Sequence, residues 1–390
     1  MRGGFGPEHL PYGVFSPANE PPRVGARLGD DVLDLAALAR GGALELPEAA
    51  LAAPVLNPLL ALGPPAWAAL RARLQALAAG PPARLAGARH PLTAVELHLP
   101  FAVADFVDFS SSLEHATNLG RILRPGTEPL GPNWRHLPIA YHGRAGSVVV
   151  SGTPVVRPCG QRPPPDAGGP PRHGPTEKLD VELELGYVIG APSRPGDPVA
   201  VADALDHVFG VVLVNDWSAR DLQAWEYRPL GPFTGKSFAT SVAAWVTPLA
   251  ALEGRRVPRA PQAPEPPAYL REAPWGYDVE LEIELCGQVV ARSGAGGLYW
   301  SIAQQIAHLT VGGAALRTGD LLATGAVSGP GPGQRGSLIE LTEDGAAPLV
   351  LADGSPRAFL ADGDEVVLRG RAGPGVELGE VRGRVRPACG

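Results

Sequence analysis

The stretch LVNDWSARDLQAWEYRPLGPFTGKSFATS, residues 213–241, decides how the rest of this chain is organised. The apolar run at 211–214 that opens it predicts a buried strand. Residues 216–225 predict a short helix, on which Asp216, Arg220 and Gln223 would share one face because they stand at i, i+4 and i+7. Proline and glycine then end this helix and turn the chain. The stretch therefore predicts one compact unit that gathers an acid, an arginine, an amide, a lysine and a hydroxyl.

Lysine is scarce in this chain, because Lys178 and Lys236 are the two lysines among 33 Lys+Arg. A lysine kept where arginine is otherwise used indicates a site that needs a compact, rotatable ammonium, although a surface lysine kept by chance is the alternative. The surrounding GPFTGKS resembles a phosphate-binding loop. However, Gly231 and Gly235 are one residue too close, and Pro232 removes an amide that such a loop needs. The pattern therefore disfavours nucleotide hydrolysis.

Composition sets the broad class. The chain has 390 residues, which is long enough for two or three domains. Its net charge of −7 disfavours a nucleic-acid partner. Cys159, Cys286 and Cys389 form no CxxC pair, so we expect reduced thiols and a cytoplasmic protein. The N-terminal residues have no apolar segment of the signal-peptide kind, and no apolar run is long enough to span a membrane.

The hydrophobic pattern predicts an α+β fold that is mainly β, with a rolled or sandwiched sheet. Residues 10–16 and 23–35 predict short strands, the second folded at Gly29–Asp30, and a helix is expected to follow Pro64 and Pro65. A domain boundary is expected near residue 100. Further strands are predicted at 147–151, 180–189, 211–214, 278–285, 338–341 and 365–368, helices at 202–208 and 299–309, and a solvated loop or lid at 163–175.

Two acidic strands are candidates for a metal site. Asp180, Glu182 and Glu184 alternate with aliphatic residues, so period two would place the three acids on one face. A hard divalent cation would neutralise their repulsion. The residues Asp278, Glu280, Glu282 and Glu284 repeat the same alternation, so periodicity alone does not decide which strand, if either, holds a metal.

The segment DFVDFSSSLEHATN, residues 105–118, adds Asp108 and His115 to the candidates. A serine nucleophile is disfavoured, because neither Ser111 nor Ser218 stands in a GxSxG elbow. A lone histidine is more often structural than catalytic, so the residue pattern leaves the role of His115 open.

Nearly end to end, the sequence resembles the fumarylacetoacetase family. The matching strings are long and independent of composition: LPYGVFS (10–16), DFSSSLEHATN (108–118), PNWRHLPIAYHGRAGSVVVSGTP (132–154), DVELELGY (180–187), NDWSARDLQAWEYRPLGPFTGKSF (215–238), RTGDLLATG (317–325) and GSLIEL (336–341). The resemblance implies a small N-terminal SH3-like β domain, residues 1–100, and a C-terminal mixed β-roll catalytic domain, residues 101–390. It also implies a homodimer.

The resemblance further implies a divalent metal, Mg²⁺ or Ca²⁺ or both. Carried over position by position, the metal site comprises Asp108, Glu182, Glu184 and Asp216, with Lys236 and Thr240 beside the metal. The resemblance thus selects the first acidic strand and leaves the second as a solvated face.

The implied reaction is hydrolysis of a C–C bond in 4-fumarylacetoacetate, which ends tyrosine and phenylalanine breakdown. Water activated by His115, itself oriented by Glu340, would attack the carbonyl, and acetoacetate would leave as an enolate beside fumarate. The implied oxyanion donors are Arg220, Gln223 and Lys236. The residues implied to hold the substrate are Arg124, Tyr141, Arg220 and Gln223, together with positions 110 and 326.

Those last two positions depart from the family pattern, since Ser110 stands where tyrosine is usual and Ala326 where threonine is usual. The loss of two hydroxyls would loosen binding or admit a related diketo acid. The alternatives are an acylpyruvate hydrolase or an oxaloacetate-type decarboxylase on the same fold, or a non-catalytic metal-binding scaffold. The N-terminal domain and the strings HATN and PLGPFTGKSF, which those two enzyme relatives generally lack, argue against them. The presence of His115, Lys236 and Glu340 argues against the scaffold.

Overall fold

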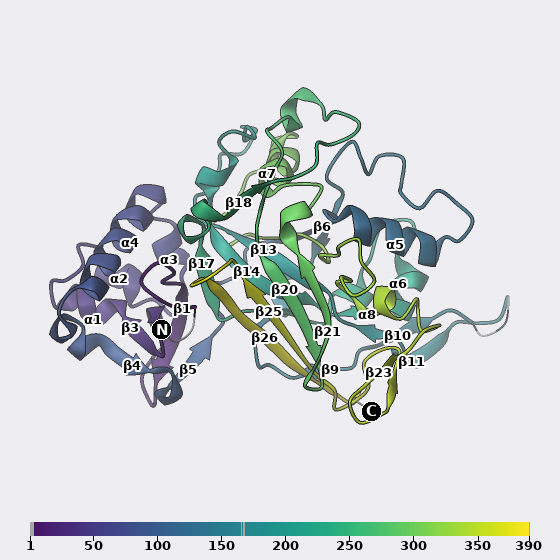
Figure 1. Cartoon of the computed structure of the whole chain (residues 1–390), viewed down its shortest axis with the longest axis horizontal. Helices are drawn as coiled ribbons and strands as arrows, with labels where there is room; N and C mark the ends of the chain where they lie inside the picture. The colour runs from purple at the N-terminus through teal and green to yellow at the C-terminus, as the bar shows by residue number, and fades with distance from the viewer. Residues whose placement is uncertain (1–3, 165, 167, 390) are drawn as a thin grey trace.

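A small unit of strands and helices forms the N-terminal part of the computed structural model, which describes residues 4–164, 166 and 168–389 (Figure 1). Its strands are β1 (Tyr12–Pro17), β2 (Arg23–Leu28), β3 (Asp31–Asp34), β4 (Arg89–Pro91) and β5 (Val95–His98). Its helices are α1 (Leu35–Arg40), α2 (Glu48–Leu51), α3 (Asn57–Leu60) and α4 (Pro64–Ala79). The predicted strands and the turn at Gly29 are confirmed, and so is the helix after Pro64, whose Leu70, Leu74 and Leu77 are buried.

One sheet continues from this unit into the rest of the chain. Its main path is β4-β3-β2-β1-β17-β14-β13-β22-β6-β7, and β5, β8 and β16 pair at its sides. The later strands are β6 (Phe106–Phe109), β7 (Ala140–Gly143), β8 (Val148–Val150), β13 (Leu183–Ile189), β14 (Val208–Asp216), β16 (Thr240–Val242), β17 (Trp245–Pro248) and β22 (Leu321–Ala323). The predicted strand at 211–214 is thus the middle of a fully buried strand, β14.

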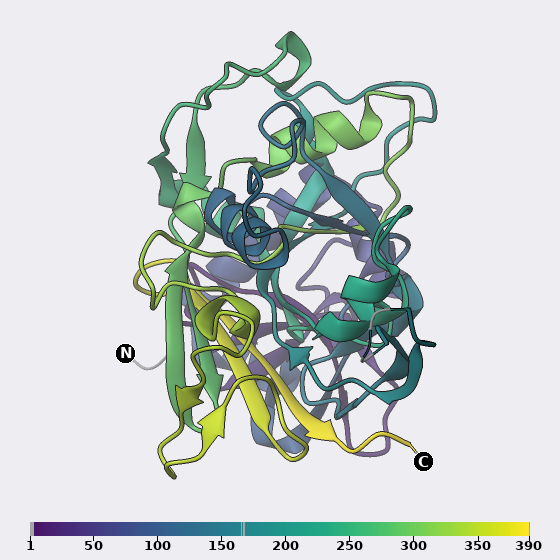
Figure 2. The ribbon, with the colours of Figure 1, turned by 90° about the vertical axis from the view of Figure 1, so that its right-hand side faces the viewer.

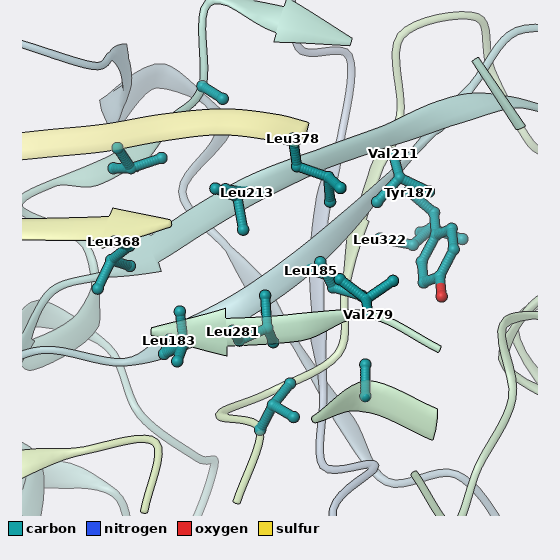
Figure 3. Packing of buried hydrophobic residues seen from close by; sticks show 14 of the residues in the cluster. Leu183, Leu185, Tyr187, Val211, Leu213, Val279, Leu281, Leu322, Leu368 and Leu378 are labelled. Atoms are coloured by element: carbon teal, nitrogen blue, oxygen red, sulfur yellow. The ribbon is translucent and has the colours of Figure 1, made fainter. Parts of the chain in front are cut away.

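A second sheet packs against β13 and β14 (Figures 1 and 2). Its order is β21 (Gln288–Gly294), β20 (Glu280–Leu285), β25 (Glu365–Arg371), β26 (Glu377–Arg386) and β9 (Val155–Val156). Between the two sheets lies the main core, where Leu185 and Leu213 meet Leu281, Leu368 and Leu378 (Figure 3). These two packed sheets confirm the expected mainly β fold class.

The remaining helices and strand pairs surround this core. The helices are α5 (Leu113–Leu123), α6 (Arg220–Glu226), α7 (Ile302–Thr310) and α8 (Leu338–Leu341). The paired strands are β10 (Cys159–Arg162) with β11 (Arg172–Pro175), β12 (Leu179–Asp180) with β15 (Ser218–Ala219), β18 (Arg256–Pro258) with β19 (Trp275–Tyr277), and β23 (Leu349–Val350) with β24 (Pro356–Arg357). Single 3₁₀ turns lie at Pro82–Arg84, Ala86–Ala88, Leu92–Ala94, Ala145–Ser147, Ala204–His207, Thr234–Lys236, Leu249–Ala251, Glu253–Arg255, Ala268–Leu270 and Ala295–Gly297.

The predicted strand at 338–341 is wrong, because these residues form helix α8. Short apolar runs do not distinguish a buried strand from a buried helix by periodicity. Here the backbone N–H groups of Leu338 and Ile339 donate to the Asp180 carboxylate, which satisfies them as a helix N-cap would. A side chain distant in sequence therefore stabilises the helical form.

The predicted helix at 216–225 begins too early. Asp216 ends strand β14, where it pairs with Thr240, and helix α6 begins at Arg220. Asp216 therefore lies outside the helix and does not share a helix face with Arg220 and Gln223. The other predicted elements beyond residue 100 lie within a few residues of observed ones, although 202–208 holds only a 3₁₀ turn.

The long predicted strand at 180–189 is split, since Asp180 belongs to β12 and β13 begins at Leu183. The expected loop at 163–175 ends in strand β11, and its residues 165 and 167 lie outside the described residues. Within those described residues, no helix is long and apolar enough to cross a membrane.

Candidate active site

One cavity of about 670 Å³ lies where strands β6 and β7 meet helices α5 and α6. Loop residues 230–233 and the segment after β22 complete its walls. The predicted site residues in its lining are Asp108, Ser110, His115, Tyr141, Glu182, Arg220, Gln223, Lys236 and Ala326. Asp216, Glu340 and Thr240 lie behind the lining, because they bond to Tyr141, to His115 and to Asp216 respectively.

Four carboxylates converge at one end of the cavity. Asp108, Glu182, Glu184 and Asp216 are buried, and each offers an oxygen within 4.8 Å of the others. The sheet brings them together: β6 pairs with β22, β22 with β13 and β13 with β14. The sequence-predicted ligand set is therefore one cluster in space.

The cluster fits a hard divalent cation. Asp108 Oδ1 and Glu184 Oε1 are buried and have no hydrogen-bond partner among the described residues. Unpaired buried carboxylate oxygens are costly, and oxygen-only ligand sets of this kind suit Mg²⁺ or Ca²⁺. The fit comes from the residues themselves, since four acids in one buried place repel one another without a neutralising charge.

The carboxyl groups differ in their protonation. Burial, reinforced by Asp216, raises the pKa of Asp108 to about 7. Burial and the neighbouring acids raise the pKa of Glu184 well above its ordinary value. Burial would raise the pKa of Glu182 too, but Arg220 and Lys236 outweigh it and hold the pKa well below the ordinary range. Without a metal, Glu182 therefore keeps its negative charge, whereas the protonated form of Glu184 is favoured.

Lys236 lies among these acids. Its ammonium donates to Glu182 Oε2 at 2.5 Å and to Ser218 Oγ at 2.9 Å, and it lies 2.6 Å from Asp216 Oδ2. Burial would lower the pKa of Lys236, but Asp216 and Glu182 raise it above its ordinary value. Three partners in three directions suit an ammonium better than a planar guanidinium, which supports the functional interpretation of this retained lysine. Lys178, by contrast, forms a partly exposed pair with Asp344.

Asp216 is held on both oxygens. Thr240 Oγ1 donates to Oδ1 at 2.6 Å and Tyr141 OH donates to Oδ2 at 2.7 Å. Thr240 therefore lies beside the cluster, as expected from the resemblance. Tyr141, expected to hold the substrate, lines the cavity with its hydroxyl directed to Asp216.

His115 and Glu340 form a buried pair at the cluster's edge. His115 Nδ1 lies 2.7 Å from Glu340 Oε2, while its Nε2 lies 3.8 Å from Glu182 Oε1. Burial lowers the pKa of His115, but Glu340 and Glu182 outweigh it, so the pKa is raised. Burial raises the pKa of Glu340, but His115 and the hydroxyl and amide donors outweigh it and hold the pKa at about 2. Glu340 is therefore a carboxylate that fixes Nδ1 as the protonated nitrogen and leaves Nε2 as a base.

Sequence reasoning missed the groups that hold Glu340. Asn118 Nδ2 donates to Oε1 at 2.8 Å, Ser337 Oγ donates to Oε2 at 2.7 Å, and Ser328 Oγ lies 2.9 Å from both oxygens. Asn118 could have been found, because it stands one helical turn after His115 on α5 and shares its face. Nothing local signals Ser328, which meets Glu340 only in the folded chain.

Arg220 and Gln223 lie on consecutive turns of α6. Arg220 donates from Nη2 to Glu182 Oε1 at 2.7 Å and from Nη1 to Gln223 Oε1 at 3.2 Å. Arginine can only donate, so this bond turns the Gln223 oxygen toward Arg220 and leaves the Gln223 amide NH₂ as a donor facing the cavity.

The other proposed substrate contacts are placed differently. Ser110 lines the cavity and accepts a hydrogen bond from Trp134 Nε1 at 3.0 Å, and Ala326 lines the cavity as a buried residue. Arg124 ends helix α5, and its Nη2 donates to Pro129 O at 2.6 Å. Among the described residues, the cavity lining does not include Arg124.

Fold and site define a class: proteins with a β-roll in which a buried carboxylate cluster shares one cavity with a His–Glu pair and buried cations. Residues 106–386 match the model of the fumarylacetoacetate (FAA) hydrolase C-terminal family, and residues 8–100 match the fumarylacetoacetase N-terminal family. The chain therefore belongs to the fumarylacetoacetase family.

Curated relatives agree over nearly the whole chain. The chain is 43% identical to fumarylacetoacetase of Homo sapiens, covering 97% of this chain and 96% of that protein. It is 44% identical to fumarylacetoacetase of Arabidopsis thaliana, covering 98% and 95%.

Solved structures share the fold at lower identity. A fumarylacetoacetate hydrolase from Exiguobacterium antarcticum has a TM-score of 0.58 at 16% identity, covering 97% of this chain and 99% of its own. Maleylpyruvate hydrolase from Sphingobium sp. SYK-6 has a TM-score of 0.56 at 18% identity, covering 97% and 100%. At these identities the likeness shows the fold alone.

Proposed function

We propose that this protein hydrolyses the C–C bond of 4-fumarylacetoacetate to give fumarate and acetoacetate, the last step of tyrosine and phenylalanine breakdown. Identity above 40% over nearly full length to curated fumarylacetoacetases supports this reaction. The observation that carries the proposal is the buried His115–Glu340 pair, which lies at the edge of a carboxylate cluster beside a cavity of about 670 Å³.

The His–Glu pair supplies the base. Glu340 holds the proton on His115 Nδ1, so Nε2 can take a proton from water in the cavity. The imidazolium that forms lies against the Glu340 carboxylate, which stabilises its positive charge. The hydroxide attacks the carbonyl next to the fumaryl group.

Three donors face the oxyanion that this attack creates. The guanidinium of Arg220, the amide of Gln223 and the ammonium of Lys236 all line the cavity near His115. Each such donor in a comparable site is worth about 3 kcal/mol of transition-state stabilisation. Collapse of the oxyanion breaks the C–C bond, and the protonated His115 returns its proton to the acetoacetate carbanion.

The four carboxylates Asp108, Glu182, Glu184 and Asp216 would hold Mg²⁺ or Ca²⁺, with Lys236 and Thr240 beside it. When bound, the cation acts as a Lewis acid for the oxygens of the diketone and of the leaving enolate. The two unpaired oxygens on Asp108 and Glu184 support this assignment, since the described residues offer them no other partner.

This chain departs from the family pattern at Ser110 and Ala326, the two positions proposed to contact the carboxylate end of the substrate. Ser110 and Ala326 line the cavity with small side chains, and Ser110 already bonds to Trp134. This observation favours one second candidate, a related diketo-acid hydrolase acting on acylpyruvates. Arg124 and Tyr141 remain proposed substrate contacts, Arg124 by rotation away from Pro129.

The test follows the loss of diketo-acid absorbance with 4-fumarylacetoacetate and with shorter acylpyruvates, using metal, chelator and restored metal. Metal-dependent formation of fumarate and acetoacetate supports the proposal. Activity on acylpyruvates alone favours the second candidate, and the double variant S110Y/A326T should then gain activity on 4-fumarylacetoacetate. Inactivity toward all of these substrates would contradict the proposal and favour a non-catalytic metal-binding scaffold.

Further proposals concern the setting of this activity. We propose an N-terminal domain of residues 1–100, a catalytic domain of residues 101–390, and a homodimer. The two family matches, at 8–100 and 106–386, support the division. A cytoplasmic location is supported by three free cysteines. Sedimentation tests the dimer, and localisation of a tagged chain tests the compartment.

A further inference from the structure

Asp180 belongs to the predicted acidic face, yet it lies outside the carboxylate cluster. It is fully buried, and both of its oxygens are paired. Oδ1 accepts hydrogen bonds from the N–H of Val181 at 2.8 Å and of Leu338 at 2.7 Å. Oδ2 accepts from Arg220 Nε at 2.7 Å and from the N–H of Ile339 at 3.2 Å. One carboxylate thus joins two segments that are distant in sequence.

Each of these two segments carries one half of the proposed chemistry. Arg220 on α6 is an oxyanion donor, and helix α8 carries Glu340, which orients His115. Leu338 and Ile339 are the first two residues of α8, directly before Glu340. Ser337, at the N-cap position of α8, makes no capping bond and donates its hydroxyl to Glu340. Asp180 therefore takes the role of the cap from outside the helix.

We infer that Asp180 is a positioning residue that holds the oxyanion donor Arg220 and the His115–Glu340 pair in register with each other. The inference rests on the proposed function and deepens it, because it names the contact that fixes the oxyanion donor Arg220 and the base His115 relative to each other. A misplacement of about 1 Å between such groups costs about 100-fold in rate.

Only a carboxylate satisfies this arrangement. Every partner of Asp180 is a donor, two on each oxygen. In D180N, one oxygen becomes an NH₂ group, so in either orientation it faces two donors. The variant must then release either Arg220 or the first turn of α8 while keeping its size.

The chain offers a matched control in Asp364. This buried acid also accepts from an arginine, Arg357 Nε at 2.9 Å, and from a backbone N–H, that of Ala361 at 2.8 Å. Among the described residues, the hydrogen-bond partners of its side chain are Arg357, Ala361 and Cys286, and none of them lines the cavity. D364N therefore imposes the same kind of local damage away from the site.

The experiment measures kcat and KM of wild type, D180N and D364N with the diketo acid that wild type hydrolyses. D180N should lose about 100-fold in kcat with KM changed by less than about threefold, while D364N keeps kcat within about twofold. Metal affinity by calorimetry should stay within about threefold in D180N, because Asp180 lies outside the carboxylate cluster and the variant keeps all four of its acids. Equal kcat values for D180N and D364N, or a large loss of metal affinity in D180N alone, would overturn the inference.

A double-mutant cycle separates positioning from general damage. Introduced into E340Q, D180N should lower kcat by less than about tenfold, because E340Q has already disrupted the His115–Glu340 pair. Full additivity overturns the inference. If D180N does not fold, D180S, which leaves room for a water, gives the same measurements. An inactive wild type would instead mark failure of the proposed function, and the inference would fall with it.

Discussion

His115 Nδ1 lies 2.7 Å from Glu340 Oε2, although 225 residues separate the two in sequence. The contact joins helix α5 to helix α8 beside the carboxylate cluster, and three further side chains hold the glutamate in place. It makes the imidazole a base with one defined free nitrogen. The first prediction concerns this pair.

E340Q should lower kcat by about 100-fold or more, because the imidazolium loses its carboxylate partner. The Glu340 charge raises the pKa of His115, so its removal lowers that pKa. A base works in its neutral form, and activity is lost as pH falls below its pKa; the acidic limb of the kcat profile should therefore move to lower pH in E340Q. H115A should abolish turnover yet bind metal as wild type does. An unmoved limb in E340Q would contradict the pair.

The two lysines make a matched comparison. K236A should lower kcat by about 100-fold to 1,000-fold, since an oxyanion donor and the charge between Glu182 and Asp216 are both lost. K236R should not restore it, because a planar guanidinium cannot satisfy the three partners of this ammonium. K178R should leave kcat unchanged, because the Lys178 side chain pairs with Asp344 and neither residue lines the cavity. Full activity of K236R would show that charge alone suffices.

Two glutamates test which acidic strand binds the metal. E182A should weaken Mg²⁺ or Ca²⁺ binding by at least about tenfold, because it removes one of four clustered carboxylates. E282A should not, since Glu282 lies on the second sheet and pairs with Arg292 and Arg369. Calorimetry on both variants provides the measurement, and equal losses would refute the assignment of the site.

Metal binding should release protons at neutral pH. Burial raises the pKa of Glu184 well above its ordinary value and that of Asp108 to about 7, whereas a bound cation requires both carboxylates ionised. Metal affinity should therefore rise with pH, and calorimetry at pH 7 in two buffers of different ionisation enthalpy should detect about one proton or more per metal. E184Q should release fewer protons. Binding that is independent of pH would contradict protonated carboxyl groups in the metal-free site.

His9 predicts acid sensitivity of the fold. Its ring is buried between Gly4 O at 2.8 Å and Thr247 Oγ1 at 2.9 Å, and burial lowers its pKa to about 4. The unfolded chain therefore binds the proton more readily, so stability is present above pH 6.5, the ordinary value, and is lost as pH falls toward 4. Between pH 7 and 5 this loss amounts to ~2 kcal/mol.

Urea unfolding at both pH values, with chelator present, checks this prediction. The free energy of unfolding of H9Q should fall by ~2 kcal/mol less than that of wild type between pH 7 and 5. H98Q, a change at the partly buried histidine that bonds Ser16, should fall as wild type does. Parallel losses in H9Q and wild type would exclude His9 as the source.

Sequence patterns went furthest where one local rule decides the outcome. The run at 211–214 forms a buried strand because all four of its side chains are apolar and are stable only away from water. The leucines at helical spacing after Pro64 form the buried face of α4. The long strings shared with the fumarylacetoacetase family predicted the fold class and the family itself.

Predictions from local periodicity failed where contacts between distant segments decide the structure. The short run at 338–341 fits strand and helix equally well by pattern, and the Asp180 carboxylate stabilises the helix. Alternation placed Asp180 beside Glu182 and Glu184, but Arg220 and α8 draw its oxygens away from that pair. For a buried carboxylate, a hydrogen-bond partner on another segment therefore decides the orientation of the side chain more strongly than the alternation along its own strand.

By itself, then, the sequence determined the mainly β class, the buried strands, and the residue types from which the site is built. Periodicity left two acidic strands equivalent, and the family resemblance selected the first of them. Only the tertiary structure decided that Asp180 pairs with Arg220 instead of joining the carboxylate cluster. The physical reason is that charge neutralisation depends on distance in space. Buried carboxylates are stable only where ammonium, guanidinium or N–H groups from remote segments meet them, and no local pattern records those partners.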